Sequence, residues 1–337
     1  MAGGLGTRLR PITDNIPKSL IPVAGRPVIF YLMESLAGVS NDFILTVSYR
    51  YEKVIDLFSG NESRDRNILF SVEKEPLGTA GGLKKVEKFV DDTFIVGNAD
   101  TVFQQDVSRL IEFHRKRKNT ITLGLTPVDN PSEYGVAKVA NGLITEFQEK
   151  PRTNPVSNLA NAGIYVMEPE VFDFIGNKRP EDVAKDLLPA LQKKGKRIGG
   201  FRMKGTWIDI GRPSDLIRAN VFVSKRSNRR INGSKLLGNV YLGKGISIGR
   251  NCILENVAIY DDVAIEDDVH VKNSVIYDDS TVGRGSQIED SILSFGSVLG
   301  EGVLISDSVI GGGLLLRKGG KIEGTVVSLG EDKPVNY

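Results

Sequence analysis

The first twenty residues, MAGGLGTRLRPITDNIPKSL, combine a glycine-rich loop with two cations. Gly3, Gly4 and Gly6 let the backbone approach a ligand closely, and their amides can form an anion-binding concavity. Arg8 and Lys18 add a guanidinium fork and a mobile ammonium, which suit different phosphate geometries. The pattern predicts a site for a polyanion such as a nucleoside triphosphate; an ordinary glycine turn beside a solvated surface pair is the alternative.

The loop matches neither of the two common phosphate-binding motifs. Position 9 is leucine, so the dinucleotide fingerprint G-x-G-x-x-G is incomplete, and no Gly-Lys-Ser or Gly-Lys-Thr follows. What stands is G-G-x-G-T-R-L-R-P with Pro-Lys at positions 17 and 18. This joint pattern is more specific than a glycine turn alone.

The elements that must position these residues follow an α/β pattern. Up to about residue 222, short apolar runs alternate with amphipathic stretches, as in a parallel sheet flanked by helices. The predicted strands are 43–47, 68–73, 93–98 and 120–125; the predicted helices are 27–38, with Pro27 first and Gly38 as the stop, 78–90 and 106–118. Asp100 then falls at the carboxyl end of a strand, the edge where open α/β sheets bind ligands. An ordinary turn cap is the alternative for a single aspartate.

The remainder of the chain carries a repeat of 17 residues. Its markers are Asn239, Asn256, Asn273, Asp290 and Asp307, together with Leu242, Ile259, Ile276, Leu293 and Ile310. Within one period the inward residues step by 6, 6 and 5, as in Ile259, Ile265, Val271 and Ile276. One turn cannot cover its own apolar face, so stacked turns build one core with Asn or Asp at a left-handed corner. This region, about 232–330, resembles the left-handed parallel β-helix of hexapeptide-repeat proteins; a β-sandwich with regular turns is the alternative.

Composition limits the class of protein. A chain of 337 residues fits about two domains, here 1–223, a basic linker at 224–231, the β-helix at 232–330 and a tail at 331–337. The formal charge of +2 gives no sign of a nucleic-acid surface or an acidic-membrane footprint. Cys252 is the only cysteine, and no apolar signal core or membrane-spanning run is present. We expect a soluble cytoplasmic protein.

The run AGGLGTRLRPITDNIPKSLIPVAGRPVI resembles the opening of the sugar-nucleotide pyrophosphorylases, which join a nucleoside triphosphate to a sugar 1-phosphate. The resemblance covers the whole first domain and implies a Rossmann-like domain with a mostly parallel sheet. It implies catalytic roles for Arg8, Lys18 and Asp100, and a Mg²⁺ site formed by Asp100 and by Asp209 in GTWIDIGRP. The nucleotide-binding residues that it implies are Ala2, Gly3, Gly4, Gly6, Thr7, Glu73 and Gly78.

The segment EKEPLGTAGGL aligns with the part of this family that reads the base. Glu73 stands where thymidylyl and uridylyl enzymes commonly carry glutamine. A carboxylate accepts hydrogen bonds only, and guanine offers two neighbouring donors, so Glu73 favours GTP over dTTP or UTP. Capping of the helix that begins near Thr79 is the alternative role for this carboxylate.

Three further segments, EYGVA, FQEKP and NAGIYV, match the sugar-phosphate segments of the family, with ordinary strand-end turns as the alternative. They imply that Gly135 presents backbone, Glu149 accepts from sugar hydroxyls, Lys150 neutralises the sugar phosphate and Asn161 bonds a hydroxyl. Together with Glu73 they look most like mannose-1-phosphate guanylyltransferases. A thymidylyl- or uridylyltransferase acting on glucose 1-phosphate and a non-catalytic regulatory relative stay open as alternatives.

The β-helix raises the question of a second activity. Some hexapeptide-repeat domains are acyltransferases, which usually need a histidine base. His270 stands outside any recognisable acyltransferase segment, and His114 lies in the first domain, so we expect a structural role and homo-oligomer assembly through the solenoid.

Family members carry an apolar strand directly before the glycine loop, whereas only Met1 and Ala2 stand there in this sequence. A start codon assigned too late and a natural truncation with decayed catalysis are the two explanations. The first is favoured because Arg8, Lys18, Asp100, Lys150 and Asp209 are all kept. As written, the chain is expected to fold with a weakened sheet and to work poorly.

Overall fold

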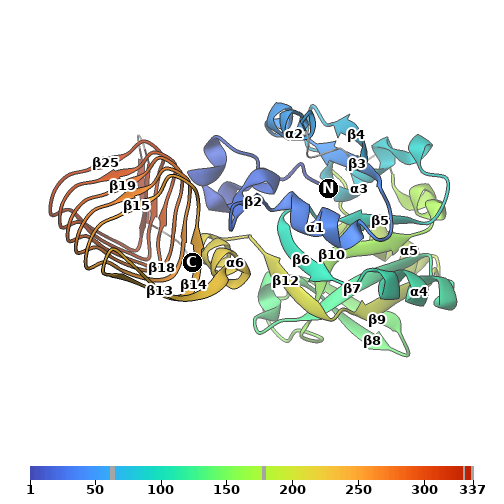
Figure 1. Ribbon diagram of the computed structural model, residues 1–337. Coiled ribbons are helices and arrows are strands. Elements are labelled where there is room, and N and C mark those ends of the chain that lie inside the picture. The colour runs from blue at the N-terminus through green and yellow to red at the C-terminus, as the bar shows by residue number, and fades with distance from the viewer. Residues whose placement is uncertain (61–64, 177–179, 329–330, 335–337) are drawn as a thin grey trace. The chain divides into compact units, whose positions relative to one another are not determined.

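The computed structural model describes residues 1–60, 65–176, 180–328 and 331–334, and its chain divides into two compact units. Unit 1 comprises Met1–Gly4 and Ile29–Trp207; unit 2 comprises Leu5–Val28 and Ile208–Tyr337. The segment Leu5–Val28, which carries Arg8 and Lys18, thus belongs to the same unit as the β-helix. Figure 1 shows the elements of both units.

Unit 1 is an α/β structure, as predicted. Its elements are α1 (Ile29–Leu36), β3 (Asp42–Val47), α2 (Tyr51–Phe58), β4 (Asn67–Val72), α3 (Gly78–Lys85), β5 (Phe94–Gly97), β6 (Thr101–Gln105), α4 (Ser108–Arg117), β7 (Ile121–Pro127), β8 (Gly135–Ala140), β9 (Leu143–Glu149), β10 (Leu159–Met167), α5 (Leu188–Lys193), β11 (Ile198–Arg202) and β12 (Gly205–Asp209), the last crossing into unit 2. All four strands and all three helices predicted from the runs above are present. Pro27, however, is not in a helix. It ends the short strand β2 (Arg26–Pro27), which pairs with β1 (Pro22–Val23), so α1 begins at Ile29.

The sheets of unit 1 combine both strand directions. β3 pairs in parallel with β4, and β7 with β11, whereas β10 runs antiparallel to β5 and β7, and β8 and β9 form an antiparallel hairpin. The order of the larger sheet is β5-β10-β7-β11-β9-β8. The sequence predicted a mostly parallel sheet. Among the described strands of the larger sheet β7 and β11 form the parallel pair, whereas β10, the β8–β9 hairpin and the contact of β9 with β11 are antiparallel.

A cavity of about 790 Å³ separates β3 from β5. Among the described residues β3 pairs only with β4, and β5 only with β10, so each strand has an open edge. The lining is mostly apolar and includes Ile44, Leu45, Ile95 and Val96. At one end Met1 enters: its amine donates to Gly97 O at 2.7 Å and its carbonyl accepts from Ala99 N at 3.0 Å, the slanted pattern of a parallel pair.

Unit 2 contains the parallel β-helix, whose strands stack as successive coils in Figure 1. Its elements are α6 (Pro213–Val223), β13 (Lys225–Ile231), β14 (Ser234–Leu242), β15 (Ser247–Ile248), β16 (Ile253–Ile259), β17 (Ala264–Ile265), β18 (His270–Ile276), β19 (Thr281–Val282), β20 (Gln287–Glu289), β21 (Ile292–Leu293), β22 (Val298–Leu299), β23 (Leu304–Ser306), β24 (Val309–Ile310), β25 (Leu315–Leu316), β26 (Lys321–Glu323), β27 (Thr325–Ser328) and β28 (Glu331–Pro334). From β16 to β24 the paired strand residues lie 17 positions apart, as Leu254 and Val271 do, whereas β27 pairs antiparallel with β28. Parts of the predicted β-helix and tail, 329–330 and 335–337, lie outside the described residues.

Three series of corner residues turn each coil. All have φ between 44° and 71°, where Asn, Asp and Gly are tolerated: Asn256, Asn273, Asp290, Asp307 and Gly324; Gly245, Asp262, Asp279, Gly296 and Gly313; Asn251, Asp268, Gly285, Gly302 and Gly319. The sequence pattern identified the first series only. Its first member was misplaced, because Gly238 (φ 70°) rather than Asn239 takes the left-handed corner, where β14 and β16 shift register by one residue.

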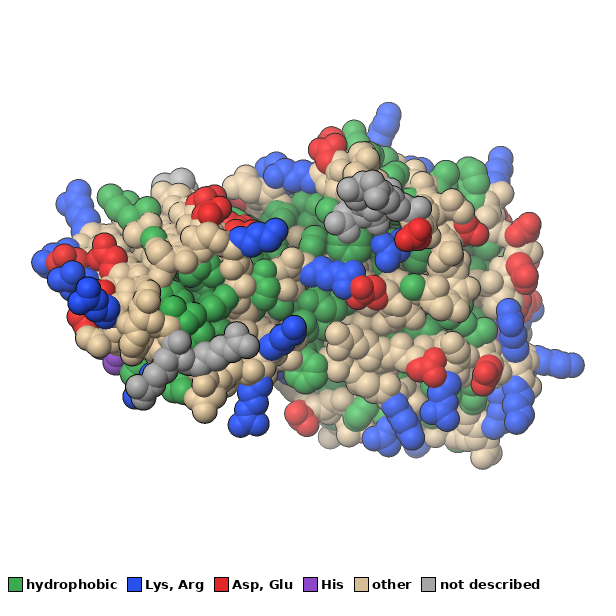
Figure 2. All heavy atoms as spheres, in the orientation of Figure 1, with side chains coloured by type: hydrophobic (Ala, Val, Ile, Leu, Met, Phe, Trp, Pro, Cys, Tyr) green, Lys and Arg blue, Asp and Glu red, His purple; other side chains and the backbone are tan. Residues whose placement is uncertain are grey.

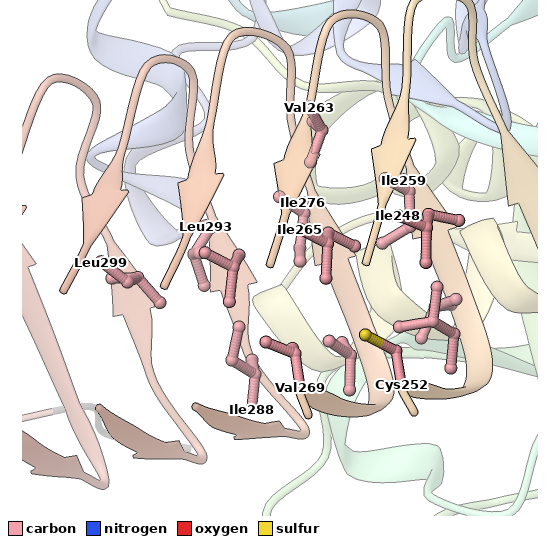
Figure 3. Packing of buried hydrophobic residues seen from close by; sticks show 14 of the residues in the cluster. Ile248, Cys252, Ile259, Val263, Ile265, Val269, Ile276, Ile288, Leu293 and Leu299 are labelled. Atoms are coloured by element: carbon pink, nitrogen blue, oxygen red, sulfur yellow. The ribbon is translucent and has the colours of Figure 1, made fainter. Parts of the chain in front are cut away.

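The interior of the β-helix is apolar, and Figure 3 shows its side chains stacked coil on coil. The predicted inward residues Ile259, Ile265, Val271 and Ile276 are all at most 3% exposed, which confirms the 6, 6, 5 step. The cysteine at position 252 is free and buried in the same interior. The basic connector is not an irregular linker: it forms β13, which pairs antiparallel with β14 along its whole length.

The surface agrees with the near-neutral charge. Figure 2 shows Lys and Arg side chains interspersed with Asp and Glu over the face in view. Within the described part of the chain, none of the helices is both long and apolar enough to span a bilayer.

Candidate functional site

Three charged residues of the predicted site, Arg8, Lys18 and Asp209, form a charge cluster within unit 2. Lys18 opens a short 3₁₀ helix, Lys18–Leu20, and Asp209 ends β12. Lys18 Nζ lies 3.4 Å from Asp209 Oδ1, and the two side chains are only 10% and 25% exposed. Solvent and salt screen the attraction between these two charges less than in a surface ion pair. The strength of the attraction therefore depends on how precisely the surrounding elements position the two side chains. The fold thus joins two predicted site residues that are 191 positions apart.

Arg8 comes to the same place. A Cβ on Gly211 would lie 3.2 Å from Arg8 Nη2 and 3.2 Å from Asp209 Oδ2, so both groups border this glycine. Only a residue without a side chain leaves that space open to a ligand. The sequence did not predict a role for Gly211, although this glycine stands two residues after the predicted metal ligand Asp209 in GTWIDIGRP.

The glycine loop divides between the units after Gly4. In unit 2, Gly6 has φ 62° and a Cβ there would lie 2.8 Å from Thr13 Cγ2, so close packing demands glycine. Thr7 then begins a 3₁₀ turn, anchored by the fully buried Leu9. In unit 1, Ala2 N donates to Thr46 O at 2.8 Å, and Gly3 packs against Ser48 at the end of β3.

Asp100 follows the carboxyl end of β5 in unit 1 by three residues, but the strand paired with β5 among the described strands is the antiparallel β10, not a parallel one. The preceding residue, Ala99, is buried and bonded to Met1. Asp209, the last residue of β12, belongs to unit 2. Within the described ranges, no group of three or more His, Cys, Asp and Glu side chains is arranged to hold a metal ion.

Glu73 contacts the backbone directly before α3 and, among the described residues, none of the first amides of the helix, so its role as a helix cap stays a prediction. Its Oε2 accepts from Leu77 N at 3.2 Å, directly before α3, and its other oxygen faces Gly82. Burial raises the pKa of this carboxyl, and the Leu77 amide lowers it in part. The role of Glu73 in reading the base stays a prediction.

Gly78 has a packing reason to be glycine. Its φ is 77° and a Cβ would lie 2.3 Å from Glu181 O. The same carbonyl accepts from Ala80 N and Gly81 N at 2.9 and 3.2 Å, so the first amides of α3 are already bonded to protein. A phosphate at this helix end would have to compete with the Glu181 carbonyl.

The predicted sugar-phosphate residues gather on neighbouring strands of unit 1. Gly135 pairs with Glu149 across the β8–β9 hairpin, and a Cβ on Gly135 would lie 2.6 Å from Glu149 Oε2. Burial raises the pKa of Glu149, while the neighbouring Lys150 lowers it. Lys150 itself has φ 48°, and its amide donates to Tyr134 O at 3.1 Å.

Asn161 lies on β10, which also contacts β8. Its Nδ2 donates to the Tyr165 hydroxyl at 2.8 Å, and its Oδ1 accepts from Gly163 N. Burial holds the pKa of Tyr165 well above its usual range. Tyr165 was missed although it lies in the quoted segment NAGIYV, because a buried tyrosine in a strand is ordinarily core.

An aromatic pair borders these strands and was also missed. Trp207, the only tryptophan, donates through Nε1 to Ala162 O at 2.8 Å, and its ring meets Tyr134 edge to face at 5.2 Å. The available signal was a single tryptophan two residues before Asp209.

Neither histidine joins this site. His114 is fully buried and bonds Thr122 Oγ1 and Glu168 Oε1 at 2.8 and 2.9 Å, as a core histidine does. His270 is exposed on β18, in the β-helix. Assembly through the β-helix stays a prediction.

A profile of the nucleotidyl transferase family matches residues 1–226, and one described as the GMPPB C-terminal domain matches residues 217–330. The chain is 37% identical over 271 residues to a mannose-1-phosphate guanyltransferase of Aspergillus oryzae, spanning 75% of this chain and 73% of that protein.

Two solved structures are similar to this one. A putative glucose-1-phosphate thymidylyltransferase from Bacillus anthracis, in complex with a sucrose, matches with a TM-score of 0.61 and 28% identity over 68% of this chain and 95% of its own. HddC from Yersinia pseudotuberculosis, complexed with GMP-PN, matches with a TM-score of 0.56 and 29% identity over 65% of this chain and 95% of its own.

Proposed function

The chain belongs to the nucleotidyl transferase family, and on that premise we propose that it joins a nucleoside triphosphate to a sugar 1-phosphate. The convergence of Lys18 and Arg8 on Asp209 supports this most directly, because it gathers cations where a polyphosphate can bind. The coverage of both domains by matching relatives supports it further.

In the proposed reaction a phosphate oxygen of the sugar 1-phosphate attacks the α-phosphorus in line. The new P–O bond forms as the bond to the β-phosphate oxygen breaks, and pyrophosphate leaves with the electron pair. No protein nucleophile is needed, so catalysis rests on positioning and on positive charge. Arg8 would meet the transferring phosphoryl oxygens, and Lys18 the phosphates close by.

A divalent metal is expected, and we propose Mg²⁺ held by Asp100 and Asp209. Carboxylate oxygens are the ligands that this hard cation prefers, so the donor set fits. Bound there, the metal would neutralise charge on the phosphates. Lys18 already bonds one oxygen of Asp209 and thereby orients its carboxylate.

GTP and mannose 1-phosphate are the proposed substrates. Relatives named mannose-1-phosphate guanyltransferase and a structural neighbour complexed with GMP-PN support a guanine nucleotide. On the sugar side, Gly135, Glu149, Lys150 and Asn161 would bind the sugar phosphate. The alternative, a thymidylyltransferase acting on glucose 1-phosphate, is favoured by the neighbour from Bacillus anthracis.

The test is pyrophosphate release. The chain is supplied with GTP, dTTP, UTP, CTP or ATP, with mannose 1-phosphate or glucose 1-phosphate, and with Mg²⁺. GTP with mannose 1-phosphate should give the highest rate, and Asp100→Asn should remove most of it, about a hundredfold or more, without lowering stability. A preference for dTTP would defeat the assignment of the base. If no pair of substrates releases pyrophosphate, even when six apolar β-forming residues are fused before Met1, a non-catalytic relative would be favoured.

Glu73→Gln tests the base reader. If the carboxylate reads guanine, the variant should shift the ratio of GTP to dTTP turnover more than it changes the summed rate. If Glu73 only caps α3, the variant should lose a little stability and keep the ratio.

A further inference from the structure

One side of the β-helix carries a column of aromatic rings. Tyr241, Tyr260, Tyr277 and Phe295 follow one another with ring centroids 5.3, 4.6 and 4.7 Å apart. Tyr260 and Tyr277 come directly after the inward residues Ile259 and Ile276, so their side chains leave the β-helix on its outer side. Yet they are only 3% and 0% exposed, which means that other parts of unit 2 cover them.

The cover is formed by α6 and by the β1–β2 hairpin. α6 packs against β14, β16 and β18 on one side and against β1 on another. The Tyr277 hydroxyl donates to Pro22 O at 3.1 Å, and the Tyr241 hydroxyl lies against Gly25, where a Cβ would be only 2.0 Å away. Gly25 therefore cannot be replaced without moving the column.

Asn220 of α6 joins the column to the hairpin. It is fully buried, and its Oδ1 accepts from the Tyr260 hydroxyl at 2.6 Å and from Ala24 N at 2.9 Å. Its Nδ2 donates to Leu216 O at 2.9 Å. A buried amide with these three hydrogen bonds fixes its neighbours strongly, because a shift would leave a buried polar atom unpaired.

Each of the two elements that Asn220 joins follows one member of the Lys18–Asp209 pair closely along the chain. The hairpin starts four residues after Lys18, and α6 starts four residues after Asp209. Ile21, just before the hairpin, and Val23, within it, are fully buried. The short connection from the hairpin back to Lys18 is therefore held in place by packing.

We propose that Asn220, Tyr260 and Tyr277 form a positioning cluster, through which the β-helix keeps the Lys18 ammonium next to the Asp209 carboxylate. These residues do not touch the substrate. They act through the two segments that carry the charges, so the β-helix takes part in the transferase reaction. The effect on catalysis rests on the proposed function, whereas the effect on Lys18 does not.

The test removes hydroxyl groups and leaves the rings. In Tyr260→Phe/Tyr277→Phe the bonds to Asn220 and Pro22 are lost and the stacking is kept. Tyr241→Phe is the matched control, because in the described part of the chain no hydrogen bond joins its hydroxyl to another group. The double variant should lower kcat for pyrophosphate release by about tenfold and leave KM for the sugar 1-phosphate within about twofold. Tyr241→Phe should match the parent chain.

A second readout does not need turnover. The amine of Lys18, in a residue only 8% exposed, is labelled with an amine-reactive anhydride and quantified by peptide mass spectrometry. The double variant should label Lys18 several-fold faster, while Lys272, whose side chain is 50% exposed on the β-helix, should label at the parent rate. Ile305→Val, which weakens the β-helix interior away from the cluster, should change neither Lys18 labelling nor kcat.

Unchanged Lys18 labelling and kcat in the double variant would overturn the positioning role. An equal loss in Ile305→Val would also overturn it, because general loosening of the β-helix would then suffice. If the parent chain releases no pyrophosphate but Lys18 labelling still rises, the proposed function fails and the positioning cluster stands.

Discussion

Unit 1 and the β-helix of unit 2 bury their apolar residues in different ways. From β16 to β24 of the β-helix each strand pairs with a strand 17 residues away, and the inward side chains form one buried cluster. In unit 1 the edges of β3 and β5 face a cavity of about 790 Å³. A repeat brings its own partner along the chain, whereas a sheet assembled from distant strands depends on each strand being in place.

The largest expected contrast comes from the same substitution made in both regions. Leu254→Ala, at a fully buried position of the β-helix, should cost about 3–4 kcal/mol of unfolding free energy. Leu45→Ala should cost about half as much, because Leu45 lines the cavity and already lacks contacts on one side. Urea unfolding is followed by Trp207 fluorescence for unit 1 and by far-ultraviolet circular dichroism for the β-helix. Equal costs would mean that the gap closes in solution.

Filling the gap should remove part of the contrast. Six apolar β-forming residues fused before Met1 would extend its parallel pairing with β5 and β3, and should stabilise unit 1 on the order of 3 kcal/mol. Pyrophosphate release should rise with stability, because the glycine loop leaves from this strand position. A six-residue Gly-Ser-Asn fusion is the control. An apolar fusion that behaves like the control would show that the cavity does not accept a strand.

The same site predicts a pH dependence confined to unit 1. Burial lowers the pKa of the Met1 ammonium from 8.0 to about 6. Between pH 8 and pH 6 the unfolded chain therefore binds a proton that the folded chain excludes, and the stability of unit 1 should fall by about 2 kcal/mol as the pH decreases. The apolar fusion removes this amine and should flatten the profile. A profile that is flat without the fusion would contradict burial of the ammonium.

The smallest effect is expected at a corner of the β-helix. Asn273 has φ 44°, so Asn273→Ala should cost about 1–2 kcal/mol, and Asn273→Gly should cost less. Denaturant midpoints of the two variants measure the difference. An alanine variant as stable as the glycine variant would show that the coil absorbs the strain elsewhere.

Part of the candidate site could be predicted and part could not. Arg8, Lys18, Asp100 and Asp209 were named from motifs, and the strand before Asp100 from its apolar run. Gly211 was not, because its role appears only when Arg8 and Asp209 border it. The contact of Glu73 with the Leu77 amide was not predicted, since the sequence offered this carboxylate only as a helix cap or a base reader.

The sequence by itself determined what depends on local repetition: the α/β alternation, the 17-residue coil, and one of the three series of corners, in which Asn and Asp tolerate left-handed backbone. Only the tertiary structure decided that the segment with Arg8 and Lys18 joins the β-helix unit, and that Lys18 meets Asp209 while Asn220 ties both supporting elements together. The reason is physical. Periodicity reports the conformation and exposed face of nearby residues, whereas a contact across 191 positions is set by how all intervening elements pack.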